Sequence, residues 1–431
     1  MAHTKFHLGY FTKFGMPAWA LDTDKTIGHD WPDGTYHIEL AKKLEAAKFD
    51  FALFEDTLTI AETYGSSMEM DLKHAVYSPK LDPMPLLPLM AQATEHIGVI
   101  ATASTTFYPP FLLARLFSTL DSLTRGRVGW NVVTSSETNA ARNFGMDALP
   151  PHGVRYDAAD EYLRLATELW ESWEEGSLVA DPATGVYVDH TKVHTVDFEG
   201  EYHKSRGPLN TLRSPQVKPV VCQAGASSRG RAFAAKYAEV IVGLAADGIE
   251  AMREFREDVR ARMVSYGRNP DDCKIVYLTP VHFTDGTSSQ TRPSTEAGFE
   301  YAAVMSATAM DIDFSKYDLD GPVDQTMVAG GHTSALDFIK SEGLKGKTLR
   351  EALDFNNKII GLGLVGTPET IADKMIAAMD EVGGDGFLIE GAGLAAHTDT
   401  LTDELIPLLQ RAGAVRDQYK GSTLREVLHE F

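Results

Sequence analysis

Polar side chains gather where apolar, strand-like runs of this sequence end. The run GRVGWNVVT contains Asn131 and then opens into the small polar stretch SSETNAARNFG, where a purely structural strand would continue or turn sharply. Other runs end in the same way, and the polar residues at their ends include Asp56, Thr102, Ser104, Ser227 and Ser228. No Ser-His-Asp or Cys-His arrangement accompanies them. We therefore expect a site that holds a polar heterocycle and does not itself attack a substrate.

The apolar runs alternate with amphipathic helical patterns over most of the chain. Eight runs are interpreted as strands, at 6–11, 51–56, 97–105, 127–134, 218–225, 239–245, 273–283 and 385–391. Eight strand–helix units predict a parallel sheet closed into a (β/α)8 TIM barrel. A doubly wound open sheet is the alternative, but LGYFTKFGMPAW lacks the glycine fingerprint that would follow its first strand. The carboxyl ends of barrel strands share one rim, where active sites lie, and no carboxylate pair stands out at one position of that rim.

One domain is predicted for residues 1–431, with two insertions. The first, near 176–215, contains an exposed hairpin in VHTVDFEGEYHKS. The second, at 285–364, has a Gly/Ser/Thr-rich start and is expected to form either a lid over the barrel mouth or an oligomer contact. Its glycines, among them Gly286, Gly330 and Gly331, are candidate hinges.

Composition excludes several classes of partner. The 431 residues carry a formal net charge of -21, which argues against nucleic acid or an anionic membrane as a partner. The N-terminus has no signal-peptide pattern, and no run is long enough to cross a bilayer. Cys222 and Cys273 lie in apolar runs and are expected to be buried free thiols of a cytoplasmic protein, with a disulfide between them as the alternative. No Cys/His cluster has metal-site spacing, so no metal is predicted.

Several long motifs resemble one family. GRVGWNVVTSSETNAARNFG, followed by HGVRYDAADEYLRLATELWESW, closely resembles the flavin-dependent monooxygenases related to nitrilotriacetate and dibenzothiophene-sulfone monooxygenases, among the bacterial luciferase-like barrels. RGPLNTLRSPQVKPVVCQAGASSRGRAFAAKYAE and PLLQRAGAVRDQYKGSTLREVL match the same pattern, so the resemblance spans nearly the whole chain. It implies a two-component monooxygenase, and we expect a homodimer or homotetramer. A separate NAD(P)H:flavin reductase would make reduced FMN (FMNH2), which this chain would bind and use with O₂ to oxygenate a small organic compound, xenobiotics included.

The resemblance also implies how FMN would be held. AGASSRGRAF would bind the phosphate on backbone N–H groups at a helix start, with Ser227 and Ser228 as hydroxyl donors; an ordinary serine N-cap is the alternative. His152 and Tyr156 would reach the phosphate or the ribityl chain, and Asn131 would reach the ring or the ribityl chain. Asp56 and the turn from Thr102 to Ser104 would lie against the ring. A cis peptide bond is expected within Ala101–Thr105, as is common in luciferase-like barrels.

Two departures from the family lie at the barrel mouth. FGMPAW places Met16 where many relatives have a histidine, and GFLIEGAGLAAHTDT replaces a pattern that often contains prolines. His332 and His397 are candidate acid/base groups on the substrate side, and a surface histidine is the alternative for each. Two rival functions remain at this point. One is an F420-dependent oxidoreductase on the same barrel, and the other is a flavin-binding protein without turnover.

Overall fold

The computed structural model describes most of the chain. The described residues are 3–15, 31–225, 227–245, 248–284, 296–329, 336–337, 339–341, 346–358, 362–391 and 395–431.

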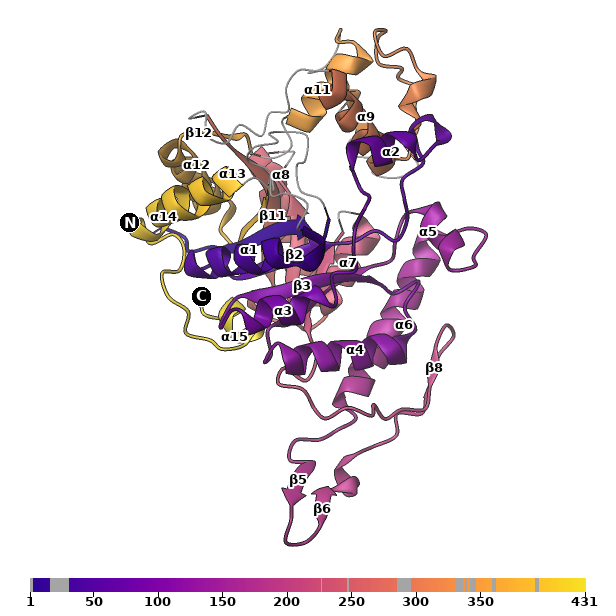
Figure 1. Cartoon of the computed structure of the whole chain (residues 1–431), viewed down its shortest axis with the longest axis vertical. Coiled ribbons are helices and arrows are strands. Elements are labelled where there is room, and N and C mark those ends of the chain that lie inside the picture. The colour runs from indigo at the N-terminus through magenta and orange to yellow at the C-terminus, as the bar shows by residue number, and fades with distance from the viewer. Residues whose placement is uncertain are drawn as a thin grey trace.

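Eight parallel strands close into a barrel, which confirms the predicted fold (Figure 1). They are β1 (His7–Lys13), β2 (Phe51–Glu55), β3 (Gly98–Ser104), β4 (Val128–Val133), β9 (Val220–Ala224), β10 (Val240–Leu244), β11 (Lys274–Phe283) and β13 (Gly386–Glu390). Neighbouring strands pair in the order β10-β9-β4-β3-β2-β1-β13-β11, and β10 also pairs with β11, which closes the ring. A short additional strand, β12 (Leu364–Gly366), extends the end of β11.

Helices cover the outside of the barrel, between successive strands and after the last strand (Figure 1). They are α1 (Thr35–Ala46), α3 (Leu86–Gln92), α4 (Pro110–Leu123), α6 (His152–Glu171), α7 (Ser228–Tyr237), α8 (Gly248–Ser265), α12 (Pro368–Val382), α13 (Ala395–Thr400) and α14 (Ile406–Arg411). Outward-facing strand residues pack against them; Trp130 of β4, for example, contacts the rings of Phe117 in α4 and Trp170 in α6.

Every second side chain of the barrel strands points inward and fills the barrel interior. Side chains two residues apart on one strand share a face, and inward-facing Leu53, Ile100, Cys222 and Leu388 form one buried cluster. Helix α15 (Leu424–Leu428) closes the amino-terminal end of the barrel, since Leu424 joins this cluster. Cys222 and Cys273 are both buried and free, as predicted.

A buried ionic network also lies at this amino-terminal end. The carboxylate of Asp50 accepts hydrogen bonds from His7 Nδ1 at 2.8 Å, from the Leu8 backbone N–H at 2.7 Å and from Arg416 Nη2 at 2.5 Å. Arg416 also pairs with Glu430 at 2.6 Å. Although burial alone would raise it, the charges of His7 and Arg416 hold the pKa of Asp50 below its usual value. This network joins the first two strands to the C-terminal segment.

The first insertion contains two hairpins, where one was predicted. The expected hairpin is β7 (Phe198–Glu199) with β8 (Lys204–Ser205). A second, β5 (Leu178–Asp181) with β6 (Val186–Val188), projects away from the barrel at the bottom of Figure 1. Its strands are short and largely exposed, so they lack the apolar alternation that identifies a strand in a sequence.

The described part of the second insertion has a small core of its own. Helices α9 (Glu296–Met310) and α11 (Leu349–Lys358) share this core and stand beside α2 (Glu69–His74) at the top of Figure 1. Glu300 of α9 accepts from Lys73 Nζ at 2.6 Å and lies 2.9 Å from His74 Nε2. The insertion therefore rests on the segment that follows β2, at the carboxyl end of the barrel. The candidate hinges Gly286, Gly330 and Gly331 lie outside the described residues.

None of the described helices is both long enough and apolar enough to cross a membrane.

Candidate active site

The residues predicted to bind FMN lie at or beyond the carboxyl ends of neighbouring strands. Asp56 follows β2, Thr102 and Ser104 end β3, and Asn131 lies in β4. Ser227 and Ser228 begin α7 after β9, while His152 and Tyr156 lie in the first turns of α6. Because these strands are parallel neighbours in the barrel, all eight residues belong to the same end of it.

A hydrogen-bond chain fixes the Asn131 amide. The Thr102 hydroxyl donates to the backbone oxygen of Phe54 at 2.8 Å, so it accepts from Asn131 Nδ2, also at 2.8 Å. This assigns the amide orientation. The Asn131 Oδ1 atom is then buried without a hydrogen-bond partner. An unpaired buried acceptor is costly, so this oxygen is suited to a donor on a ligand.

The turn after β3 is built from hydroxyl groups. Ser104 Oγ accepts from the Thr106 N–H at 3.1 Å and from the Ser135 hydroxyl at 2.8 Å. The Thr105 N–H donates to the Val133 oxygen at 2.9 Å, so the pairing of β3 with β4 continues into the turn. The prediction of a cis peptide bond within Ala101–Thr105 is wrong, because all of these bonds are trans. The extended pairing with β4 and the hydroxyl contacts hold the turn with ordinary trans bonds.

The N-terminus of α7 forms an open cradle. Ser227 caps the helix by accepting from the Gly230 N–H at 3.0 Å, which is the ordinary N-cap role left open by the sequence. Ser228 is exposed. A Cβ on Gly225 would lie 2.5 Å from Gln223 Nε2, and one on Gly230 would lie 3.0 Å from Tyr156 OH. Neighbouring side chains thus leave no room for a Cβ at either glycine, while the exposed Ser227 and Ser228 leave the start of α7 open to a phosphate.

Aromatic and polar groups of α6 border this cradle. The Tyr156 hydroxyl lies 3.4 Å from Gln223 Nε2, and its ring lies 4.9 Å from that of His152. Gln223 Oε1 is buried without a partner. Arg229 is held by Asp157 and Asp160 at 2.9 and 2.5 Å, so α6 already neutralises its charge.

Arg155 is a further candidate that sequence reasoning missed. Its Nη1 donates to the Pro150 oxygen, whereas its Nε is buried and has no hydrogen-bond partner. The only sequence signal was its position in the HGVRYDAAD motif, between His152 and Tyr156.

Asp56 is a half-buried carboxyl at the rim. Burial raises the pKa of Asp56 to about 7, and the negative charges of Glu55 and Asp82 contribute to the rise while Lys80 opposes it. The group therefore changes protonation near neutral pH, which is typical of functional carboxyls.

A carboxylate pair does exist at the rim, contrary to the sequence interpretation. Glu55 ends β2 and Glu390 ends β13, and these two strands flank β1. Burial raises the pKa of Glu390, and the Glu55 carboxylate raises it further. The pair was missed because 335 residues separate its members in the chain (390 minus 55), and only closure of the barrel brings them together.

The structure describes only one of the two histidine candidates. His332 and the departure at Met16 lie outside the described residues. His397 is fully buried, with Nε2 2.9 Å from the Val281 oxygen, and burial lowers the pKa of His397 to about 4. It is therefore neutral at pH 7.

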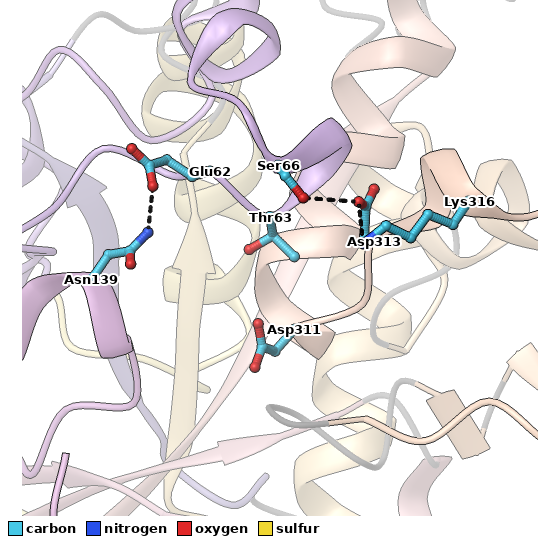
Figure 2. A pocket seen from close by; sticks show the side chains of 7 residues that line it. All are labelled: Glu62, Thr63, Ser66, Asn139, Asp311, Asp313 and Lys316. Atoms are coloured by element: carbon cyan, nitrogen blue, oxygen red, sulfur yellow. Dashed lines mark hydrogen bonds and ion pairs between the residues drawn. The ribbon is translucent and has the colours of Figure 1, made fainter. Parts of the chain in front are cut away.

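A separate polar hollow of about 410 Å³ lies near the same end of the barrel (Figure 2). Its walls come from the segment after β2, from α5 (Thr138–Asn143) and from the second insertion. Asn139 donates to Glu62 at 2.8 Å, and Asp313 is bonded to Ser66 and Lys316, as Figure 2 shows. None of the predicted FMN-binding residues lines it. Among the described residues, no group of three or more His, Cys, Asp or Glu side chains is placed to hold a metal ion.

The chain belongs to a known family. The model of the family described as luciferase-like monooxygenase matches residues 6–386, so the chain belongs to that family. It is 38% identical over 418 residues to dibenzothiophene-sulfone monooxygenase of Rhodococcus erythropolis, a match that covers 93% of this chain and 90% of the relative.

Solved structures agree with this assignment. The crystal structure of a long-chain alkane monooxygenase matches with a TM-score of 0.86 and 32% identity, covering 99% of this chain and 96% of the other. A riboflavin lyase solved with modified FMN and riboflavin matches with a TM-score of 0.85 and 29% identity, covering 99% and 96%.

Proposed function

We propose that this protein is the oxygenase component of a two-component flavin-dependent monooxygenase. It would take reduced FMN from a separate reductase and use O₂ to oxygenate a small organic substrate. The observation that carries the proposal is the open cradle at the start of α7, which faces the same barrel end as the polar groups of β3 and β4. The named activities of the relatives support the oxygenase class.

The residues present fit an FMN molecule. Its phosphate needs hydrogen-bond donors, and the start of α7 offers backbone N–H groups together with the hydroxyls of Ser227 and Ser228. The unpaired Arg155 Nε is a cationic donor on the adjacent helix. Flavin ring N–H and ribityl hydroxyl groups need acceptors, and Asn131 Oδ1 and Gln223 Oε1 are buried acceptors without partners.

When bound, reduced FMN would supply the electrons that activate O₂ for transfer of one oxygen atom to the substrate. The chain's own part would be to bind, orient and protect. The hydrogen-bond chain from Asn131 through Thr102 would fix the position of the flavin ring relative to β3 and β4. Asp56, with its pKa near 7, would hold or release a proton at its carboxyl oxygen beside the ring. The second insertion would limit the access of water from above.

The reductase would be a separate protein. LGYFTKFGMPAW, which begins within β1, lacks the glycine fingerprint of a nicotinamide-binding fold. Purified protein with NADH and FMN should therefore neither consume O₂ nor form product, and adding a free flavin reductase should start both. Turnover without a reductase would contradict the two-component assignment.

The same assay separates the rival functions. F420-dependent chemistry would show F420 binding and no coupled O₂ uptake. A flavin-binding protein without turnover would bind FMN and give no oxygenated product with any reductase.

A further inference from the structure

Charged side chains continue the inward-facing rows of three adjacent strands. In the barrel interior, Phe11, Leu53 and Leu388 belong to one apolar cluster. Side chains two positions further along a strand face the same way. The residues at those positions are Lys13, Glu55 and Glu390. Since β1 lies between β2 and β13, these three groups stand together at the mouth, above the apolar core.

Lys13, and Lys80 beside Glu55, both donate hydrogen bonds to protein acceptors. Lys80, whose side chain is 5% exposed, donates to the two carboxylate oxygens of Glu55 at 2.7 and 2.9 Å and to Thr57 at 3.1 Å. Lys13 Nζ donates to the Val76 backbone oxygen at 2.7 Å. The charge of Lys80 is therefore offset by Glu55, and the charge of Lys13 acts on Glu390, whose pKa it lowers.

The carboxylates exceed the cations. Glu55 is paired, whereas Asp56 and Glu390 form no ion pair within the part of the chain that the structure describes. Asp82 acts on Asp56 through its charge, so the negative field extends beyond the strand ends. The described mouth therefore carries an excess of acidic groups.

The opposite wall of the mouth is apolar. On β9, β10 and β11 the inward rows run through Cys222, Val242 and Val276. Continuing them by two or four residues gives Ala224, Leu244 and Pro280. Leu244 is 45% exposed at its strand end, although it is a large apolar side chain. An organic molecule entering the mouth thus meets apolar contacts on one side and acidic groups on the other.

We propose that the barrel mouth selects small organic substrates without net negative charge, which have an apolar body and a neutral or cationic polar end, and rejects carboxylates and other anions. The proposal rests on the proposed function, because it assumes that the flavin binds at this mouth. The anionic phosphate of FMN is compatible with it, since the phosphate would bind at the start of α7, beyond the apolar wall formed by β9.

The test measures access of charged and neutral probes to bound flavin. FMN-loaded protein is titrated with iodide and, separately, with acrylamide at constant ionic strength, and quenching of flavin fluorescence is recorded. Relative to free FMN, the iodide-to-acrylamide ratio of quenching constants should fall at least about fivefold, because the acidic mouth repels the anion. Raising the KCl concentration should bring the ratio back toward that of free FMN, because salt screens the acidic groups. This test uses the wild-type protein alone.

Two variants and a control locate the effect. At pH 8 and above, where Asp56 is ionised, Asp56→Asn removes one charge; Glu55→Gln removes one charge and also releases the Lys80 ammonium. Each should raise the ratio by about three- to fivefold. Glu62→Gln removes an equal charge in the polar hollow of Figure 2 and should leave the ratio unchanged.

The outcomes separate this proposal from the proposed function. If FMN binds but iodide quenches as readily as it quenches free FMN, charge selection is wrong and the monooxygenase assignment stands. Unchanged ratios in both variants, or no response to KCl, would also overturn charge selection. Failure of the wild-type protein to bind FMN would overturn both.

Discussion

The phosphate cradle can be tested by separating its two serines. Ser227 has two proposed roles, the N-cap of α7 and a donor to phosphate, whereas Ser228 is exposed and has only the second. Ser228→Ala should therefore weaken FMN binding without changing stability. Ser227→Ala should weaken binding and also destabilise the fold by about 1 kcal/mol through loss of the cap.

The size of the binding effect follows from the charge of the phosphate. A hydrogen bond to a charged group contributes about 1.5–3 kcal/mol, and each 1.4 kcal/mol is tenfold in Kd. Each substitution should thus raise the Kd for FMN by roughly 10- to 150-fold. Riboflavin lacks the phosphate, so its Kd should change little.

The assay is fluorescence titration of FMN and riboflavin, together with urea unfolding. Thr423→Ala is the matched control, because Thr423 caps α15 in the same way, by accepting from the Glu426 N–H, at the amino-terminal end of the barrel. It should lower stability as Ser227→Ala does and leave FMN binding intact. Equal weakening of FMN and riboflavin by the serine variants would refute the cradle.

Three further results are expected. FMN affinity should fall as pH rises through about 7, because ionised Asp56 adds negative charge beside the flavin, and in Asp56→Asn titrations this step should be absent. Asp50→Asn should destabilise the fold by about 1.5–3 kcal/mol in urea, because Arg416 keeps Glu430 but loses a buried, charged hydrogen-bond partner. Since the pKa of Asp50 is lowered in the fold, its stabilisation is present above pH 4 and is lost as pH falls below that value; a wild-type curve without this loss would contradict the network. Deleting residues 296–358 should preserve FMN binding but raise peroxide release per NADH in the coupled assay, and unchanged coupling would show that the insertion is no lid.

The barrel could be predicted from the sequence because its strands are buried on both faces. Runs such as VGWNVV and KPVVCQ are apolar and short, and helices with one apolar face separate them. Hairpin β5–β6 escaped prediction because Val179 and Tyr187 are exposed, so no periodic burial marks its strands. The second insertion could be recognised by its length and its Gly/Ser/Thr-rich start.

Individual residues of the candidate site could be predicted from the sequence where they lie at the end of a strand. Asn131 and Thr102 stand out because polar groups interrupt apolar runs. Their shared hydrogen bond, and the pairing of Glu55 with Lys80, depend on register and on loops that fold back onto the rim. His397 shows the converse, since only the structure reveals that a polar residue after the last strand is fully buried.

The proposed function requires that this chain, without a second protein, uses reduced FMN and O₂ to oxygenate an organic compound. The most direct measurement mixes the protein with photochemically reduced FMN, without NADH or reductase, in buffer saturated with ¹⁸O₂ and containing a panel of uncharged sulfides, sulfones and alkanes. Mass spectrometry should find a product that carries one ¹⁸O atom, in an amount limited by the flavin supplied. Recovery of all the label as hydrogen peroxide, at the rate seen for reduced FMN without protein, would contradict the account.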